Sequence, residues 1–218
     1  MDARSVIEQK MEAALACIEK AEYQEAVKLL KDVIELDPYE VNAYRLCGQA
    51  YFYLCEDDRA ISSFNAALIF DRHHESTLVW RGLAYMNKQR FGKAIRDLSE
   101  AIKMNPASAY LYQRGISYLA LNDCEKALID IRQVLILEPQ DSDAQEKLES
   151  CLLAIIENDL LTQFKKIDVA SAIQLLSESQ QLKINEYVDK KFNFIRHSFW
   201  GLNLVSAATT SSALRIKR

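Results

Sequence analysis

The chain has 218 residues, of which 50% are hydrophobic and 27% charged, with a net charge of −4, five glycines and three prolines. This apolar content is ample for a core, and the scarcity of Gly and Pro argues against disorder and against sheets built on tight turns. No run of eighteen apolar residues occurs and the polar start lacks the apolar core of a secretion signal, so we expect neither a spanning helix nor an exported protein.

Apolar residues recur at three- and four-residue steps, the period of one helix face, and the prolines end segments because proline disfavours helix in the residue before it. The expected helices, in chain order, cover residues 5–20, 23–37, 41–54, 57–70, two segments within 75–107, then 108–121, 123–137, 142–158 and 169–182. Ser5, with Glu8 three residues later, is expected to cap the first of them. The predicted fold class is therefore all-α.

Three residue types share one period between positions 1 and 141 of the chain. Gly48, Gly82 and Gly115 recur with a period of about 34 residues. Four alanines recur with the same period: Ala26, Ala60, Ala94 and Ala127. The prolines, Pro38, Pro106 and Pro139, follow the same register, with Arg72 in the missing proline place. A helical hairpin of this size cannot bury its apolar face alone, so the pattern predicts stacked units.

The register resembles the tetratricopeptide repeat, a helix–turn–helix unit of about 34 residues with a small residue in the eighth place, an aromatic in the eleventh and alanine in the twentieth. Tyr51, Tyr85 and Tyr118 fill the aromatic place. We place units at 7–40, 41–74, 75–107 and 108–141, so that residues 1–141 form four repeats. The first unit departs from the pattern, with Ala14 and Cys17 in the glycine and tyrosine places, as an end unit packed on one side would. The resemblance implies a right-handed superhelix.

The repeat register fails after Ser142. Residues 142–182 are expected to hold a capping helix and a degenerate repeat-like helix, because a solenoid needs an end helix over its last apolar face. Residues 183–218 carry seven Lys and Arg against two Asp and Glu, and we expect them to form a basic, aromatic C-terminal helix and a frayed tail. The aromatic residues of this segment are Tyr187, Phe192, Phe194, Phe199 and Trp200.

No catalytic, metal-binding or cofactor-binding pattern is present. His73 and His74 are adjacent in a predicted turn and have no accompanying Cys/His set, and the glycines sit inside helices rather than in a phosphate-binding loop. The five cysteines form no C-x-x-C pair and are typical of a reducing compartment, so we expect a cytoplasmic protein. Most of these thiols fall at packing positions, which should raise their pKa values. The chain is therefore expected not to be an enzyme and to need no cofactor or metal.

In the family that the chain resembles, the first helix of each unit lines a concave groove that holds a peptide. The groove positions of the family's repeat correspond in this sequence to the candidate binding residues Arg45, Gln49, Phe52, Tyr53, Val79, Trp80, Leu83, Met86, Tyr112 and Ile116. The first unit adds Met11, Leu15 and Ile18 beside Glu8 and Glu12. An apolar, aromatic wall suits an amphipathic helix, although some of these side chains could instead pack between neighbouring helices.

Several partner hypotheses stay open at the level of sequence. The favoured one is a protein-interaction scaffold or adaptor. Some family members hold the C-terminal carboxylate of chaperone tails with a clamp of several cationic and amide side chains. The positions of that clamp contain a single cation here, Arg45, so we do not expect this chain to bind such tails. Residues 186–204 are expected to fold back into the groove or pack on the solenoid end, self-association is left open, and the alternative is membrane contact through the basic tail. The acidic body excludes nucleic acid as the main partner.

Overall fold

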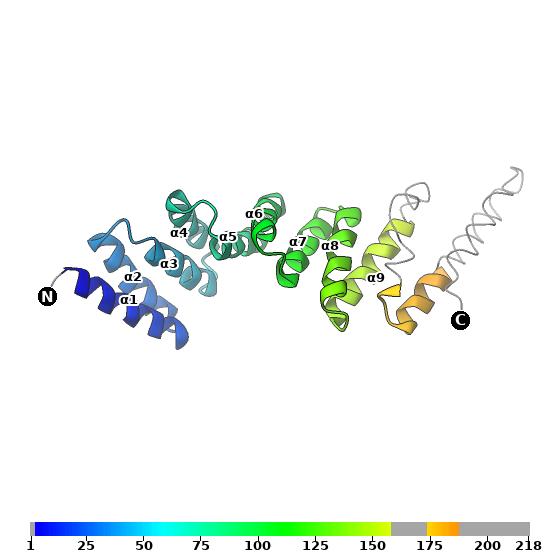
Figure 1. Cartoon of the computed structure of the whole chain (residues 1–218), viewed down its shortest axis with the longest axis horizontal. Coiled ribbons are helices and arrows are strands. Elements are labelled where there is room, and N and C mark those ends of the chain that lie inside the picture. Colours follow the sequence, from blue (N-terminus) through cyan, green and yellow to red (C-terminus); the bar gives the residue numbers. More distant parts are fainter. Residues whose placement is uncertain (1–2, 158–173, 188–218) are drawn as a thin grey trace, which may run out of the picture. The chain divides into compact units, whose positions relative to one another are not determined.

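A computed structural model of the chain describes residues 3–157 and 174–187, and all regular structure in these two stretches is helical. Figure 1 shows the helices following one another along the chain. Their bounds are α1 Ala3–Glu19, α2 Tyr23–Leu36, α3 Val41–Tyr53, α4 Asp57–Phe70, α5 Glu75–Asn87, α6 Phe91–Met104, α7 Ser108–Ala120, α8 Cys124–Leu137 and α9 Ser142–Glu157, followed by a helix over 178–187. The all-α prediction is confirmed. None of the helices in these stretches combines the length and hydropathy that a membrane span requires.

The chain divides into two compact units, Met1–Leu121 and Asn122–Arg218. In the first, α1 pairs with α2, α3 with α4 and α5 with α6, and each pair also packs on the helix that follows it. The pairs coincide with the first three predicted repeats, and α7 is the first helix of the fourth. In the second unit, α8 packs against α9.

Small residues allow the paired helices to approach each other closely. A Cβ on Gly48 would lie 2.5 Å from the ring of Phe64, and one on Gly82 would lie 3.2 Å from Cγ of Leu98. The four alanines that share the twentieth place, Ala26, Ala60, Ala94 and Ala127, are all 0% exposed. The glycine and alanine register therefore marks the contact line of each hairpin, because no larger side chain fits there.

The turn inside each hairpin repeats one backbone conformation. The residues with positive φ among those described are Ala21, Cys55, Gln89 and Asn122, at 60°, 59°, 54° and 60°. Each occupies the same place in its own repeat, so these turns follow the period of the glycines and alanines. In the first three turns the next residue donates its amide proton back into the preceding helix, as Glu56 does to the Tyr51 carbonyl at 2.9 Å and Arg90 to Tyr85 at 2.8 Å. These turns are Schellman caps, which usually have glycine at the left-handed position.

A polar network links the α5–α6 pair to α4 of the preceding pair. Arg81 of α5 donates to both carboxylate oxygens of Asp97 on α6, each at 2.7 Å, and to Oδ1 of Asn65 on α4 at 2.8 Å. One repeat later, Arg114 donates to Oγ of Ser99 at 3.1 Å in the same register. Each arginine thus ties the first helix of a unit to the second helix of the unit before it.

Two predictions about helix ends are wrong. Ser5 lies inside α1, which already includes Ala3, so it is not a cap. The helix expected over 169–182 is interrupted at 175–177. Ser177 begins a new helix instead: Oε1 of Gln180 accepts from the Ser177 amide at 3.2 Å, the capping-box arrangement.

The helix over 178–187 crosses the boundary expected at 182/183. It packs on α9 through Lys183, whose Nζ lies 3.4 Å from Glu149, and its Ile184 is fully buried. The predictions for Phe192, Phe194, Phe199 and Trp200, and for most of the segment 186–204, fall outside the described residues.

Candidate functional site

The ten candidate binding residues all lie on the first helices of their units, and we call the surface they form on α3, α5 and α7, with its continuation on α1, the first-helix face. Nine of the ten side chains are half-buried, and Tyr53 is exposed, at 47%. Phe52, Trp80 and Met86 pack against the buried core, and Val79 packs on a second cluster around Leu78. These four side chains therefore contribute to the packing of the repeats as well as to the surface.

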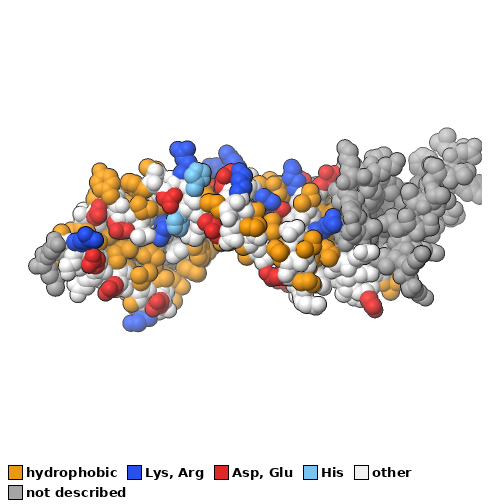
Figure 2. All heavy atoms as spheres, viewed as in Figure 1, with side chains coloured by type: hydrophobic (Ala, Val, Ile, Leu, Met, Phe, Trp, Pro, Cys, Tyr) orange, Lys and Arg blue, Asp and Glu red, His pale blue; other side chains and the backbone are white. Residues whose placement is uncertain are grey.

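Three of the candidates form an aromatic cluster. The ring of Trp80 meets Phe52 edge-on with centroids 5.3 Å apart, and it meets Tyr53 edge-on at 5.6 Å. Tyr23 of α2, which sequence reasoning missed, stacks on Tyr53 at 4.8 Å. Figure 2 shows hydrophobic side chains gathered over the region of α1 and α3. The cluster presents rigid aromatic area from two successive units, the kind of surface that anchors a partner side chain.

Arg45, predicted to be available to a partner on the groove wall, instead contacts another side chain of this chain. Its guanidinium contacts Nε2 of His74, and His74 in turn caps α5 by accepting from the Thr77 amide at 3.3 Å. Arg45 is therefore held at the turn that leads into the next unit. His74 therefore has a structural role as the N-cap of α5, whereas the sequence predicted only a turn residue at this position.

The charge of the first-helix face is acidic at its N-terminal end. The repeat register places Glu8, Glu12 and Glu19 of α1 where α3 has Asn42, Leu46 and Tyr53 and where α5 has Ser76, Trp80 and Asn87. All three glutamates are exposed. Glu8 is bonded to Arg4 at 3.3 Å, and Leu15, which is 43% exposed, lies among them in the sequence pattern. This end of the face therefore combines carboxylates with an accessible apolar side chain.

Four of the five thiols lie in buried or half-buried packing positions, and Cys55 is exposed. All five cysteines are free. Burial raises the pKa of the Cys151 thiol to about 12, and burial likewise raises the pKa values of Cys17, Cys47 and Cys124. The expected shift is confirmed, and these thiols are protonated and weak nucleophiles at neutral pH. In the described part of the chain no group of His, Cys, Asp or Glu has the arrangement of a metal site.

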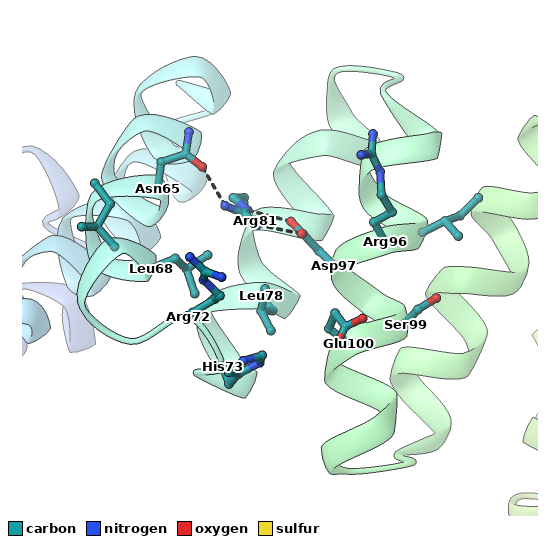
Figure 3. Close-up of a pocket in the computed structure, with 12 residues that line it drawn as sticks. Asn65, Leu68, Arg72, His73, Leu78, Arg81, Arg96, Asp97, Ser99 and Glu100 are labelled. Carbon is teal, nitrogen blue, oxygen red and sulfur yellow. Dashed lines mark hydrogen bonds and ion pairs between the residues drawn. The ribbon is translucent and has the colours of Figure 1, made fainter.

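A cleft outside the first-helix face was not predicted from the sequence. It is a cleft of about 830 Å³ between α4 and α6, above α5, and Figure 3 shows its lining. We call it the α4–α6 cleft. Its base contains the Arg81–Asp97 ion pair and the buried Leu68 and Leu78, and its edges carry Ile69, Arg72, His73, Ile95, Arg96 and Glu100. A signal was present in the sequence, because Arg72 replaces the proline of the repeat and Ile69 is an apolar residue at an outward position.

Paired helices, tight glycine contacts and turns of one period define a helical-repeat protein. Family models described as tetratricopeptide repeat match residues 10–40 and 81–144. These two stretches of the chain are tetratricopeptide repeats, as the resemblance of the sequence predicted.

Two relatives illustrate how far this likeness extends. Serine/threonine-protein phosphatase T of Trypanosoma brucei brucei is 36% identical over 88 residues, which are 38% of this chain and 18% of that protein. Anaphase-promoting complex subunit 3 of Schizosaccharomyces pombe is 27% identical over 195 residues, 86% of this chain and 29% of that protein. The chain thus spans less than a third of the curated relatives it matches.

Solved structures share the fold. MamA of Desulfovibrio magneticus RS-1 superposes with a TM-score of 0.65 at 14% identity, over 89% of this chain and 97% of that one. The first repeat domain of Spaghetti (RPAP3), bound to the HSP90 peptide SRMEEVD, superposes with a TM-score of 0.51 at 26% identity, over 55% of this chain and 96% of that one.

Proposed function

We propose that this chain is a non-catalytic interaction scaffold whose first-helix face binds a peptide or an amphipathic helix of a partner protein. The observation that carries the proposal is the aromatic cluster of Phe52, Tyr53 and Trp80, which joins two repeats and leaves Tyr53 accessible. Aromatic side chains that are rigid and partly exposed are the usual anchors of protein interfaces.

The comparisons support an interaction role in general terms. The RPAP3 domain carries a peptide of HSP90, and other relatives are parts of larger proteins or assemblies by name. The match to phosphatase T covers only 18% of that enzyme, so it gives no reason to propose phosphatase activity here.

The chemistry of the face favours a basic partner segment. Glu8, Glu12 and Glu19 are exposed on α1, and the one cation among the candidates, Arg45, is already in contact with His74. An acidic tail of the HSP90 kind would meet carboxylates and find no cluster of cations. We therefore propose a helix with leucine-like side chains on one face and lysine or arginine beside them.

Two tyrosines provide a matched test. Tyr53, 47% exposed, stacks on Tyr23, while Tyr39, 77% exposed, meets Phe70 edge-on at 6.1 Å. Tyr39→Ala removes one aromatic contact and should cost about 0.5–1.5 kcal/mol of stability. Tyr53→Ala should cost more, because Tyr53 also meets the rings of Phe52 and Trp80. In a pull-down of partners, Tyr53→Ala should lose binding and Tyr39→Ala should retain it. Equal binding by both variants would argue against the first-helix face.

Folding of residues 186–204 into this face remains part of the proposal as a way to regulate access. Leu176, just before the helix over 178–187, and Ile184 within it are both buried, so a truncation that tests this idea should end after Tyr187 rather than earlier. Tighter partner binding by the shortened chain is the expected result, and unchanged binding would remove the idea.

A further inference from the structure

The α4–α6 cleft has the features of a second binding site, separate from the first-helix face. Most of its residues come from the second helices of two successive units, α4 and α6, and from the turn that precedes α5, and α5 itself adds Leu78 and Arg81. The first-helix face is formed by other residues of α5 and by α1, α3 and α7. Its volume of about 830 Å³ is that of a site for several side chains rather than for a single ion. None of the ten candidate binding residues lines it.

The base of the cleft is preorganised. Asp97 is 7% exposed and is held by two hydrogen bonds from Arg81, which also donates to Asn65. This network satisfies the charges at the base internally, so a ligand gains little from displacing it. The apolar parts of the lining are Leu68, Leu78 and Ile95, together with Ile69, whose side chain is 80% exposed. A large apolar side chain this open beside a cleft favours contact with an apolar group of a partner.

The charge at the edges of the cleft is positive. Arg72 makes neither a hydrogen bond nor an ion pair within the described stretches, and Figure 3 shows it beside His73 on one side of the cleft, with Arg96 on the α6 side. Arg96 donates only a long bond of 3.4 Å to the Gly92 carbonyl, which leaves other guanidinium protons available. The acid at the edge, Glu100, is paired with Lys103 at 2.6 Å, and this bond lowers the pKa of Glu100. Both carboxylates that line the cleft, Asp97 and Glu100, are therefore already paired, and the two arginines remain available to a ligand.

From this combination we infer that the α4–α6 cleft binds an acidic, apolar peptide segment, with a carboxylate between Arg72 and Arg96 and a branched aliphatic side chain on Ile69 and Ile95. The charge preference is opposite to that of the first-helix face. The scaffold therefore has two docking surfaces that select different partner segments, and each surface is tested independently of the other.

The test uses the full chain and a short fluorescein-labelled peptide in which glutamate and leucine alternate. Binding is followed by anisotropy, and the site is located through the methyl NMR signals of Ile69 and Ile95. We expect Arg72→Glu and Arg96→Glu each to weaken binding by about tenfold. Lys20→Glu, which makes the same charge change at an exposed residue outside the cleft, and Tyr53→Ala on the first-helix face should leave binding unchanged. Circular dichroism of each variant verifies folding, and Arg72→Gln serves if a charge reversal fails to fold.

Four results would overturn the inference. They are equal binding of a lysine–leucine peptide of the same length, no change in the Ile69 and Ile95 methyl signals, equal loss of binding in Lys20→Glu, and complete displacement of the peptide by inorganic phosphate. The last result would show a plain anion site in which the apolar lining has no part.

Discussion

Single residues set the spacing between the paired helices. Gly48 faces the ring of Phe64 so closely that a Cβ would overlap it. A Cβ on Gly82 would lie 3.2 Å from Leu98, which would have to shift slightly, and Gly92 has no neighbour within 4 Å. The three glycines therefore differ in what a side chain would cost, although the sequence shows only that two of them share a register.

This difference predicts a graded response to alanine. Gly48→Ala should destabilise the chain by about 1–3 kcal/mol because the aromatic ring has to move. Gly92→Ala should stabilise it by about 0.5–1 kcal/mol, because alanine is the better helix former where nothing is in contact. Urea midpoints measured side by side test this, and equal shifts in both variants would contradict the packing described for Gly48.

For the first-helix face, the sequence predicts which helix face a side chain lies on but not which neighbours it contacts. Phe52, Tyr53 and Trp80 share a register that places them on one face, and they do lie together. The contact of Arg45 with His74 depends on which way a long side chain turns, and Tyr23 joins the cluster from another helix. Neither fact follows from the spacing of residues along one helix.

At the scale of elements, three of the turns have backbone strain that could not be predicted from the sequence, because the residue in the left-handed conformation is not glycine. Ala21, Cys55 and Gln89 adopt the left-handed conformation, which costs a residue with a side chain about 1–2 kcal/mol relative to its usual backbone. Asn122, at the same place one repeat later, tolerates it better. The turns hold this conformation because the following amide bonds to a carbonyl near the end of the preceding helix.

Relief of this strain should stabilise the fold. Gln89→Gly is expected to raise the free energy of unfolding by about 0.5–1 kcal/mol, the release of strain less the greater entropy of glycine in the unfolded chain. Gln89→Ala is the control, because it removes the side chain and keeps the strain, so its urea midpoint should not rise. A lower midpoint for Gln89→Gly would mean that the left-handed turn is absent.

The observed helix ends agree closely with the predicted ones where a proline follows the helix. The helices before Pro38, Pro106 and Pro139 end at Leu36, Met104 and Leu137, as the prolines and the residues before them require. The prediction of one helix over 169–182 fails at 175–177, because Ser177 and Gln180 have the spacing of a capping box that begins a new helix. The α4–α6 cleft was missed for a different reason, since a cleft depends on the distance in space between helices of two successive repeats.

At the scale of the whole molecule, the stacking of hairpins explains how the chain forms extended surfaces. Each hairpin hides its apolar side on the next, so successive units present side chains of the same register in rows. Where these rows carry Glu8, Glu12, Tyr53 and Trp80 the surface suits a basic, apolar segment. Where they carry Ile69, Arg72 and Arg96 it suits an acidic one.

The most direct test of the proposed function is to locate a bound helix on the full chain by methyl NMR. The probe is an amphipathic peptide with leucine on one face and lysine beside it. Its addition should shift the methyl signals of Leu15, Val79, Leu83 and Ile116, and Glu12→Lys should weaken binding by about tenfold. Glu35→Lys, the same change at an exposed residue of α2, should not weaken it. Shifts confined to Ile69, Ile95 and Ile129, or equal effects of the two charge reversals, would contradict the first-helix face as the binding surface.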